Sequence, residues 1–324
     1  MPSSTRHFVN PVQSAIRRWV LGVFPRGQSG IDYDTPAGDA GLFGPDTVTW
    51  RVHADFPGML AGGLCALLLQ ALHPRALAGV WDHSDFRADL VGRLRRTTAF
   101  VAGTSYAGTA EAQRLIARVA AIHVRVRGTT AAGVPYAADD PDLLTWVHVS
   151  EAYAFVQGFR AYAGMAMPRA LEDRYYDESR RVAEALGARD VPASAGEIER
   201  YFAGVRPELQ FDARSREVLA VLHRIRLPVP GAALSREVFL GAGAALLPTW
   251  AEALLGIGVV QRARHRACAH LLRASAPVFR AALPDGIAPR ACARVGAPAS
   301  LLRQWEGVRG ADIVARTTRR DGAG

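Results

Sequence analysis

Residues 109–127 read TAEAQRLIARVAAIHVRVR, and this stretch decides the fold class. At 100° per residue its larger apolar side chains form one stripe along a helix: Leu115, Ile116, Val119, Ile122 and Val126. From Asp46 onward most of the chain is rich in alanine and leucine, and its apolar residues keep this helical spacing. Sustained Val/Ile/Thr alternation with Asn-Gly or Asp-Gly turns does not occur. We therefore predict an all-α protein built as a single large helical domain.

Proline, glycine and capping residues divide the chain. Residues 1–45 are rich in proline and glycine, which predicts an irregular arm with one short helix near Ser14–Val23. Residues 46–285 predict the helical domain, and residues 286–324 a C-terminal extension with a flexible tail. Within the domain we expect a helix over 109–127, ended by Gly128, and another from Asp140-Pro141 to about Ala163.

The basic residues exclude several kinds of enzyme. All 39 are arginine, so a pyridoxal Schiff base, a lysine aldolase and a P-loop phosphate site are excluded, because each needs a lysine amine. The net charge of +9 suits a nucleic acid or an anionic membrane. However, the arginines are scattered, and no zinc-finger or RNP signature accompanies them. We therefore expect no nucleic-acid partner, while peripheral membrane contact stays open.

Cysteine usage and apolar runs indicate the compartment. Cys65, Cys268 and Cys292 are odd in number and widely spaced, which predicts reduced thiols. The N-terminus lacks the apolar core of a secretory signal, so we expect a cytoplasmic protein.

The longest uncharged run, 56–72, is shorter than the ~20 residues of a spanning helix. This predicts a buried core helix.

His123 lies inside the apolar stripe of residues 109–127. Such a histidine is most often a satisfied core residue, and less often a ligand. Arg127 lies one turn further along this predicted helix, at the edge of the stripe, where a guanidinium can meet an anionic group. A haem needs a neutral axial imidazole and favours an arginine near a propionate.

Two other helices carry polar residues in unusual places. Arg93 and Thr97 share one border of the preceding helix, with Arg96 further round; a solvated arginine face is the simpler interpretation. Glu151 lies near the middle of a buried stripe, with His148 three residues before it. A lone buried carboxylate is costly, so an ion pair with an arginine from a neighbouring helix is as reasonable as an acid–base role.

Several ordered segments resemble the latex-clearing protein (rubber oxygenase) and MpaB-type oxygenase family. They are LLLQALHP at 67–74, GV at 79–80, DHSDF at 82–86, RLRRT at 93–97, IHVRVRG at 122–128 and DPDLLTWVH at 140–148. The resemblance implies an all-α fold with a globin-like core around one haem b. It also implies that His123 is the proximal iron ligand, with His148 as the second candidate.

The resemblance also suggests roles for the other polar residues. Arg93, Arg96 and Thr97 would support the cofactor or bound oxygen as catalytic residues, and Arg127, His148 and Glu151 would bind the cofactor. Arg96 stands where rubber oxygenases have a lysine that can coordinate iron. A guanidinium does not deprotonate, so we expect an open or water-occupied distal position.

The predicted function is a haem-b-dependent oxygenase that uses O₂ on a hydrophobic unsaturated or aromatic small molecule. The alternative is a non-enzymatic helical protein that binds haem or lipid.

Overall fold

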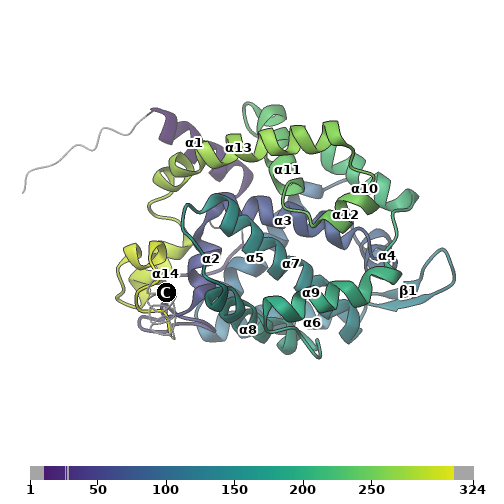
Figure 1. Cartoon of the computed structure of the whole chain (residues 1–324). Helices are drawn as coiled ribbons and strands as arrows, with labels where there is room; N and C mark the ends of the chain where they lie inside the picture. The colour runs from purple at the N-terminus through teal and green to yellow at the C-terminus, as the bar shows by residue number, and fades with distance from the viewer. Residues whose placement is uncertain (1–10, 26, 28, 310–324) are drawn as a thin grey trace, which may run out of the picture.

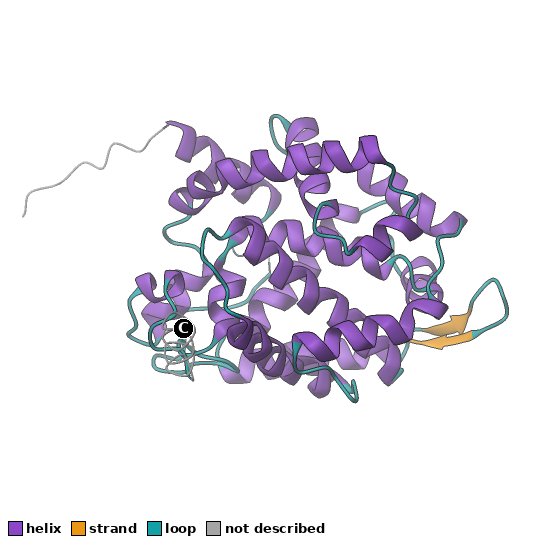
Figure 2. Ribbon diagram, viewed as in Figure 1, coloured by secondary structure: helices purple, strands orange, loops and turns teal. Residues whose placement is uncertain are grey.

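The computed structural model describes residues 11–25, 27 and 29–309. Its regular structure is almost entirely helical, with one small β hairpin projecting from the body (Figure 2). This confirms the all-α prediction. The helices are α1 (Pro11–Val23), α2 (Val48–Ala54), α3 (Phe56–Gln70), α4 (Pro74–His83), α5 (Leu90–Tyr106), α6 (Thr109–His123), α7 (Pro141–Tyr162), α8 (Arg169–Leu186), α9 (Ala195–Val205), α10 (Ala213–Arg224), α11 (Ala232–Ala244), α12 (Thr249–Leu254), α13 (Val259–Ala282) and α14 (Ile287–Arg294). The strands are β1 (Arg127–Thr129) and β2 (Pro135–Ala137), and short 3-10 helices cover Arg206–Glu208 and Ala299–Arg303.

Helices α3 and α7 pack along each other at the centre of the protein (Figure 1). Small residues allow the close approach: a Cβ atom on Gly62 would lie 2.8 Å from the Ala154 carbonyl oxygen, and one on Gly158 only 2.2 Å from that of Gly58. Helix α11 packs against α3, and α13 crosses above both in Figure 1. The two central helices therefore provide a rigid wall on which a site can be built.

The hairpin of α5 and α6 lies on another side of this wall. The two helices pack on each other, α5 also contacts α2, and α6 contacts α8. The backbones of α5 and α6 come close to those of α3 and α7 at few points. The hairpin is thus held mainly through its neighbours and not by direct packing on the central pair.

The uncharged run predicted as a core helix falls in α3, most of which is buried. That prediction is confirmed. Among the described residues, no single helix is long and apolar enough to cross a membrane. Helices α2 and α3 together reach the required length, but they meet at a 90° bend.

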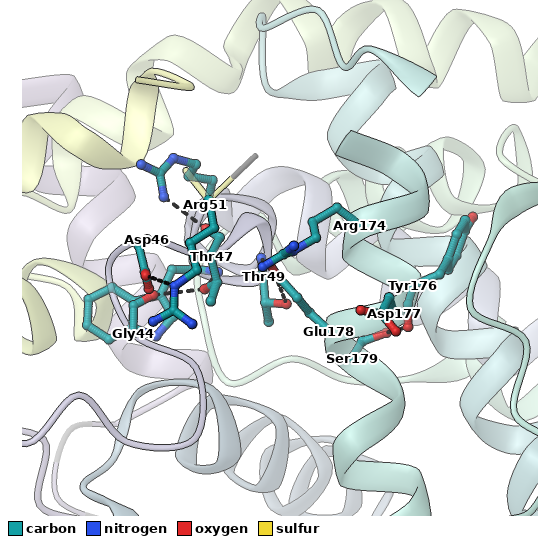
Figure 3. Close-up of polar contacts among 12 residues, drawn as sticks. Gly44, Asp46, Thr47, Thr49, Arg51, Arg174, Tyr176, Asp177, Glu178 and Ser179 are labelled. Atoms are coloured by element: carbon teal, nitrogen blue, oxygen red, sulfur yellow. Dashed lines mark hydrogen bonds and ion pairs between the residues drawn. The ribbon is translucent and has the colours of Figure 1, made fainter. Parts of the chain in front are cut away.

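A buried arginine ties the C-terminal segment to α2 (Figure 3). Arg51 is 1% exposed and donates hydrogen bonds to the carbonyl oxygens of Pro45 and Thr47, each at 2.8 Å. It also donates to the carbonyl oxygens of Gln304 at 2.7 Å and Glu306 at 3.1 Å. One guanidinium therefore satisfies four backbone acceptors from two distant segments.

The same end of α2 is joined to α8 through Glu178, which is 0% exposed. One carboxylate oxygen of Glu178 accepts hydrogen bonds from the backbone N–H and the hydroxyl of Thr49, both at 2.9 Å, and the other pairs with Arg174 at 2.9 Å (Figure 3). Both oxygens of this buried carboxylate accept hydrogen bonds within the protein, so we assign Glu178 a structural role.

Candidate cofactor site

One face of the central helix α3 is only partly covered by packing. Leu60, Gly63, Leu67 and Gln70 recur at helical spacing and are only half-buried, while the rest of the helix is mostly buried. A Cβ atom added to Gly63 would meet no atom within 4 Å, unlike one on the adjacent Gly62. Open space therefore borders this face of α3.

The facing turn of α7 presents Val147, His148 and Glu151, which are also half-buried. Burial raises the pKa of Glu151 to about 7, an effect that a hydrogen bond with the Gln70 side chain opposes. Burial likewise lowers the pKa of His148 to about 4. Both side chains are therefore strongly desolvated, although each keeps some accessible surface. Glu151 makes no ion pair in the described part of the chain. The arginine considered as its partner from the sequence is not found there, and the Gln70 amide is its hydrogen-bond partner instead.

Helix α5 supplies the opposite wall. Leu90 and Val101, near its two ends, pack against the main hydrophobic core. Thr97 and Thr98 lie between them on the same helical face, yet both are exposed. From the exposure of Thr97 and Thr98 we infer that space separates this stretch of α5 from the core, and we call the space bordered by these faces of α3, α7 and α5 the central groove.

A chain of hydrogen bonds at the other end of α5 was missed in the sequence. His53 on α2 bonds the Ser105 hydroxyl through Nδ1 at 2.6 Å and the Tyr175 hydroxyl through Nε2 at 2.8 Å. Because the Ser105 hydroxyl donates to the Val101 carbonyl oxygen, it accepts from His53 Nδ1–H, and Tyr175 donates to Nε2. No sequence signal links these residues, since they are 52 and 122 positions apart.

His53 is neutral at physiological pH. Its pKa is lowered to about 3, first by burial and then by the nearby His148. Tyr175 in turn lies within electrostatic range of Glu151. The chain from Ser105 to Tyr175 therefore lies at the side of the central groove that carries His148 and Glu151.

His123, the expected iron ligand, ends α6 on the same face as Ile116 and Val119. Its Nδ1 atom is buried without a hydrogen-bond partner, and in the described part of the chain neither ring nitrogen is bonded. Burial lowers its pKa, against a smaller opposing effect of Asp139, so the ring is neutral. An unpartnered neutral imidazole is what axial ligation of haem needs. The site therefore fits a haem ligand at this position, although no contact joins His123 to His148 among the described residues.

The predicted helical position of Arg127 is wrong. Helix α6 ends at His123, and Arg127 begins β1 opposite Ala137. The β-branched residues around Gly128 favour an extended hairpin, in which the Val126 carbonyl oxygen accepts from Ala138 N–H at 2.9 Å. Arg127 is exposed and pairs with Asp139 at 2.7 Å, so it does not lie one helical turn from His123.

The arginines of α5 are separated by the structure. Arg93 is half-buried and donates to the Ser84 hydroxyl at 2.7 Å; burial lowers its pKa, and Arg96 adds to this effect. Arg96 is exposed and lies 3.5 Å from Asp89, the residue that caps the start of α5. Thr97 borders the central groove. Arg96 thus lies at the surface, whereas the half-buried Arg93 is bonded to Ser84; the roles of Arg93 and Thr97 toward a cofactor stay predictions.

No group of three or more His, Cys, Asp or Glu side chains in the described ranges is arranged to hold a metal ion. This finding concerns sites built from protein ligands alone. Haem iron is held by four porphyrin nitrogens and needs only one or two protein ligands. A single unpartnered histidine is therefore sufficient on the protein side.

Comparison with known families matches residues 50–316 to the family described as ER-bound oxygenase mpaB/B′/rubber oxygenase, catalytic domain. The matched range covers most of the chain and includes every helix that borders the central groove. No curated protein and no solved structure was found to match.

Proposed function

Because the chain belongs to the family of mpaB and rubber oxygenase catalytic domains, whose members are oxygenases, we propose that it is a haem-b-dependent oxygenase. Its proposed substrates are O₂ and a hydrophobic unsaturated or aromatic small molecule. The observation that carries the haem assignment is the neutral imidazole of His123, whose ring nitrogens have no hydrogen-bond partner among the described residues. His123 ends α6, and α6 packs against α5, the helix that borders the central groove.

In this proposal each polar residue has a limited task. His123 offers a ring nitrogen to iron, and His148 is the second candidate because its low pKa keeps it neutral. Arg93 offers a guanidinium to a propionate, and the exposed hydroxyl of Thr97 can donate within the groove. Haem b, when bound, would supply the one-electron and O₂ chemistry that side chains lack.

Glu151 is suited to hold a proton during turnover. With a pKa of about 7, its carboxyl group is partly protonated near neutral pH and can give or take a proton at a carboxylate oxygen. Gln70 orients this group by its hydrogen bond, and Gln70 is itself fixed by donation to the Val147 carbonyl oxygen at 3.3 Å. The apolar side chains that border the rest of the groove favour a hydrophobic substrate.

The test is oxygen uptake by the full-length protein reconstituted with haem. With ascorbate as reductant and geraniol or naphthalene as probe, we expect uptake above that of the same concentration of free haem, and a product that contains oxygen from ¹⁸O₂. The non-enzymatic alternative gives a haem complex with uptake no greater than free haem. That result would contradict the oxygenase proposal.

We also propose that the protein contacts anionic membranes through the outer face of α13. This helix carries no acidic residue over its whole length. Val259 and Val260 are each 75% exposed, and Arg266 is exposed on the same helix. Basic residues beside exposed apolar ones suit an anionic bilayer surface. Sedimentation with phosphatidylglycerol vesicles should exceed that with phosphatidylcholine and should fall for a V259D/V260D variant; no difference between the lipids contradicts the proposal.

A further inference from the structure

An apolar pocket lies where α1 and α11 meet α3, α5 and the segment after α10. Its volume is about 50 Å³, and its lining includes Trp19, Leu60, Leu64, Leu94 and Phe239. Every lining residue except Ser235 and Arg236 is apolar or aromatic. Trp19 is held in place by stacking on Phe239 with ring centroids 5.6 Å apart. We call this hollow the α1–α11 pocket.

Arg236 is the only charged residue in the lining, and its bonding is incomplete. Arg236 is half-buried, and its Nε atom is buried without a hydrogen-bond partner; among the described residues the guanidinium makes one long hydrogen bond, 3.3 Å, to the Ile225 carbonyl oxygen. Among the described residues no carboxylate pairs with it, because the adjacent Glu237 pairs with Arg264 at 2.7 Å. A buried guanidinium donor without an acceptor is costly, and an anionic ligand atom would remove that cost.

The Ser235 hydroxyl is not free to bind an anionic ligand atom. Its hydroxyl oxygen accepts from Trp19 Nε1 at 3.2 Å, and its hydrogen is directed to the carbonyl oxygens of Gly231 and Ala232, each at 3.2 Å. The hydroxyl is therefore satisfied within the protein. The pocket thus combines an apolar lining with one unmatched cationic donor group.

Two residues of the pocket lining lie on helix faces that also border the central groove. Leu60 of α3 lies on the same helical face as Gly63, and Leu94 of α5 lies on the same face as Thr98, one turn along in each case. Both faces therefore run from the pocket lining toward the central groove.

We propose that the α1–α11 pocket binds a molecule with an apolar chain and a terminal carboxylate. Arg236 binds the carboxylate, and the chain extends along α3 and α5 toward the central groove. That this molecule is the substrate rests on the proposed oxygenase function; that the pocket binds it does not.

Trp19 provides a direct probe of occupancy. The full-length protein is titrated, with and without bound haem, with 2-bromododecanoic acid below its critical micelle concentration. Its bromine lies beside the carboxylate, and therefore beside Trp19 when Arg236 holds that group, where it quenches tryptophan fluorescence. The matched neutral ligand is 2-bromododecan-1-ol. We expect saturable quenching by both, with the acid binding about tenfold more tightly, as one charge-assisted hydrogen bond gives. Trp19→Phe should remove the saturable signal.

Substitutions at Arg236 test the carboxylate. Arg236→Met should weaken binding of the acid about tenfold and leave the alcohol unchanged, whereas Arg236→Lys should keep most of the preference for the acid. Arg200→Met on the exposed face of α9 is the matched control and should change neither ligand. The far-ultraviolet circular dichroism of each variant reports its folding.

Three results would overturn the proposal: equal affinity for acid and alcohol in the wild type, unchanged acid affinity in folded Arg236→Met, or quenching that survives Trp19→Phe. Preference for the acid in a protein that binds no haem would leave this pocket standing and remove the oxygenase function. Haem binding without a preference for the acid would contradict the proposed ligand of the α1–α11 pocket and leave the oxygenase proposal standing.

Discussion

Replacing Glu151 by glutamine should make the haem-free protein more stable above neutral pH and leave it unchanged in mild acid. The carboxyl group borders the central groove, and burial raises its pKa from 4.5 to about 7. Glutamine has nearly the same shape and can keep a hydrogen bond with Gln70, so the substitution removes the ionisation and little else.

The magnitude follows from the two pKa values. Between pH 4.5 and about 7 the folded protein retains a proton on Glu151 that the unfolded chain has lost. The free energy of unfolding of the wild type therefore falls as the pH rises, by about 1.4 kcal/mol per pH unit, and levels off above pH 7. Over the whole interval the loss is roughly 3 kcal/mol, reduced by any contact that the carboxylate keeps with water.

The assay is urea unfolding of wild type and Glu151→Gln at half-unit steps from pH 4.5 to 8.5. We expect the variant to gain stability relative to the wild type as the pH rises, up to roughly 3 kcal/mol at pH 8. Glu199→Gln on α9, where the side chain is 74% exposed, is the control and should stay within about 0.5 kcal/mol at every pH. A difference between Glu151→Gln and wild type that does not vary with pH would refute the reasoning.

Four further substitutions test one wall of the groove and the hydrogen bonds made by α2. Gly63→Ala should be neutral or stabilise by up to about 1 kcal/mol because its Cβ atom meets open space, whereas Gly62→Ala should destabilise by about 1–3 kcal/mol; thermal unfolding of the pair decides. Arg51→Met should cost about 3 kcal/mol in urea unfolding, since the buried guanidinium and its hydrogen bonds to four carbonyl oxygens are lost; a loss under about 1 kcal/mol would contradict the structural role. Tyr175→Phe should cost about 1–3 kcal/mol by leaving Nε2 of His53 unpartnered, and an unchanged melting temperature would show that the bond contributes nothing.

Local signals in the sequence were enough to predict most of the fold. Asp140 and Pro141 predicted the start of α7, where Asp140 caps the helix by accepting from Asp142 N–H. The apolar stripe predicted α6, of which Leu115 and Ile116 are buried. Its end was predicted four residues too late, because residues 124–126 leave the helix through a turn and residues 127–129 pair as a strand, which tertiary context decides.

The candidate site was only partly predictable. Helical spacing identified Glu151 as a carboxylate in a buried stripe, but whether an arginine or an amide would face it depends on how α3 packs against α7. The bonds of His53 join α2, α5 and α8, and only tertiary packing brings these helices together. The open space at Gly63 is likewise a property of packing, since the adjacent Gly62 is filled. The globin-like arrangement of the core and the domain limits stay predictions.

Optical absorption of the purified protein after expression with added haem tests the haem assignment most directly. The wild type should show a Soret band that shifts on reduction and again with carbon monoxide. His123→Ala should lose this band while remaining folded, and His270→Ala, which alters an exposed histidine of α13, should keep it. A wild type without bound haem, or a His123→Ala protein with the wild-type spectrum, would contradict iron ligation by His123.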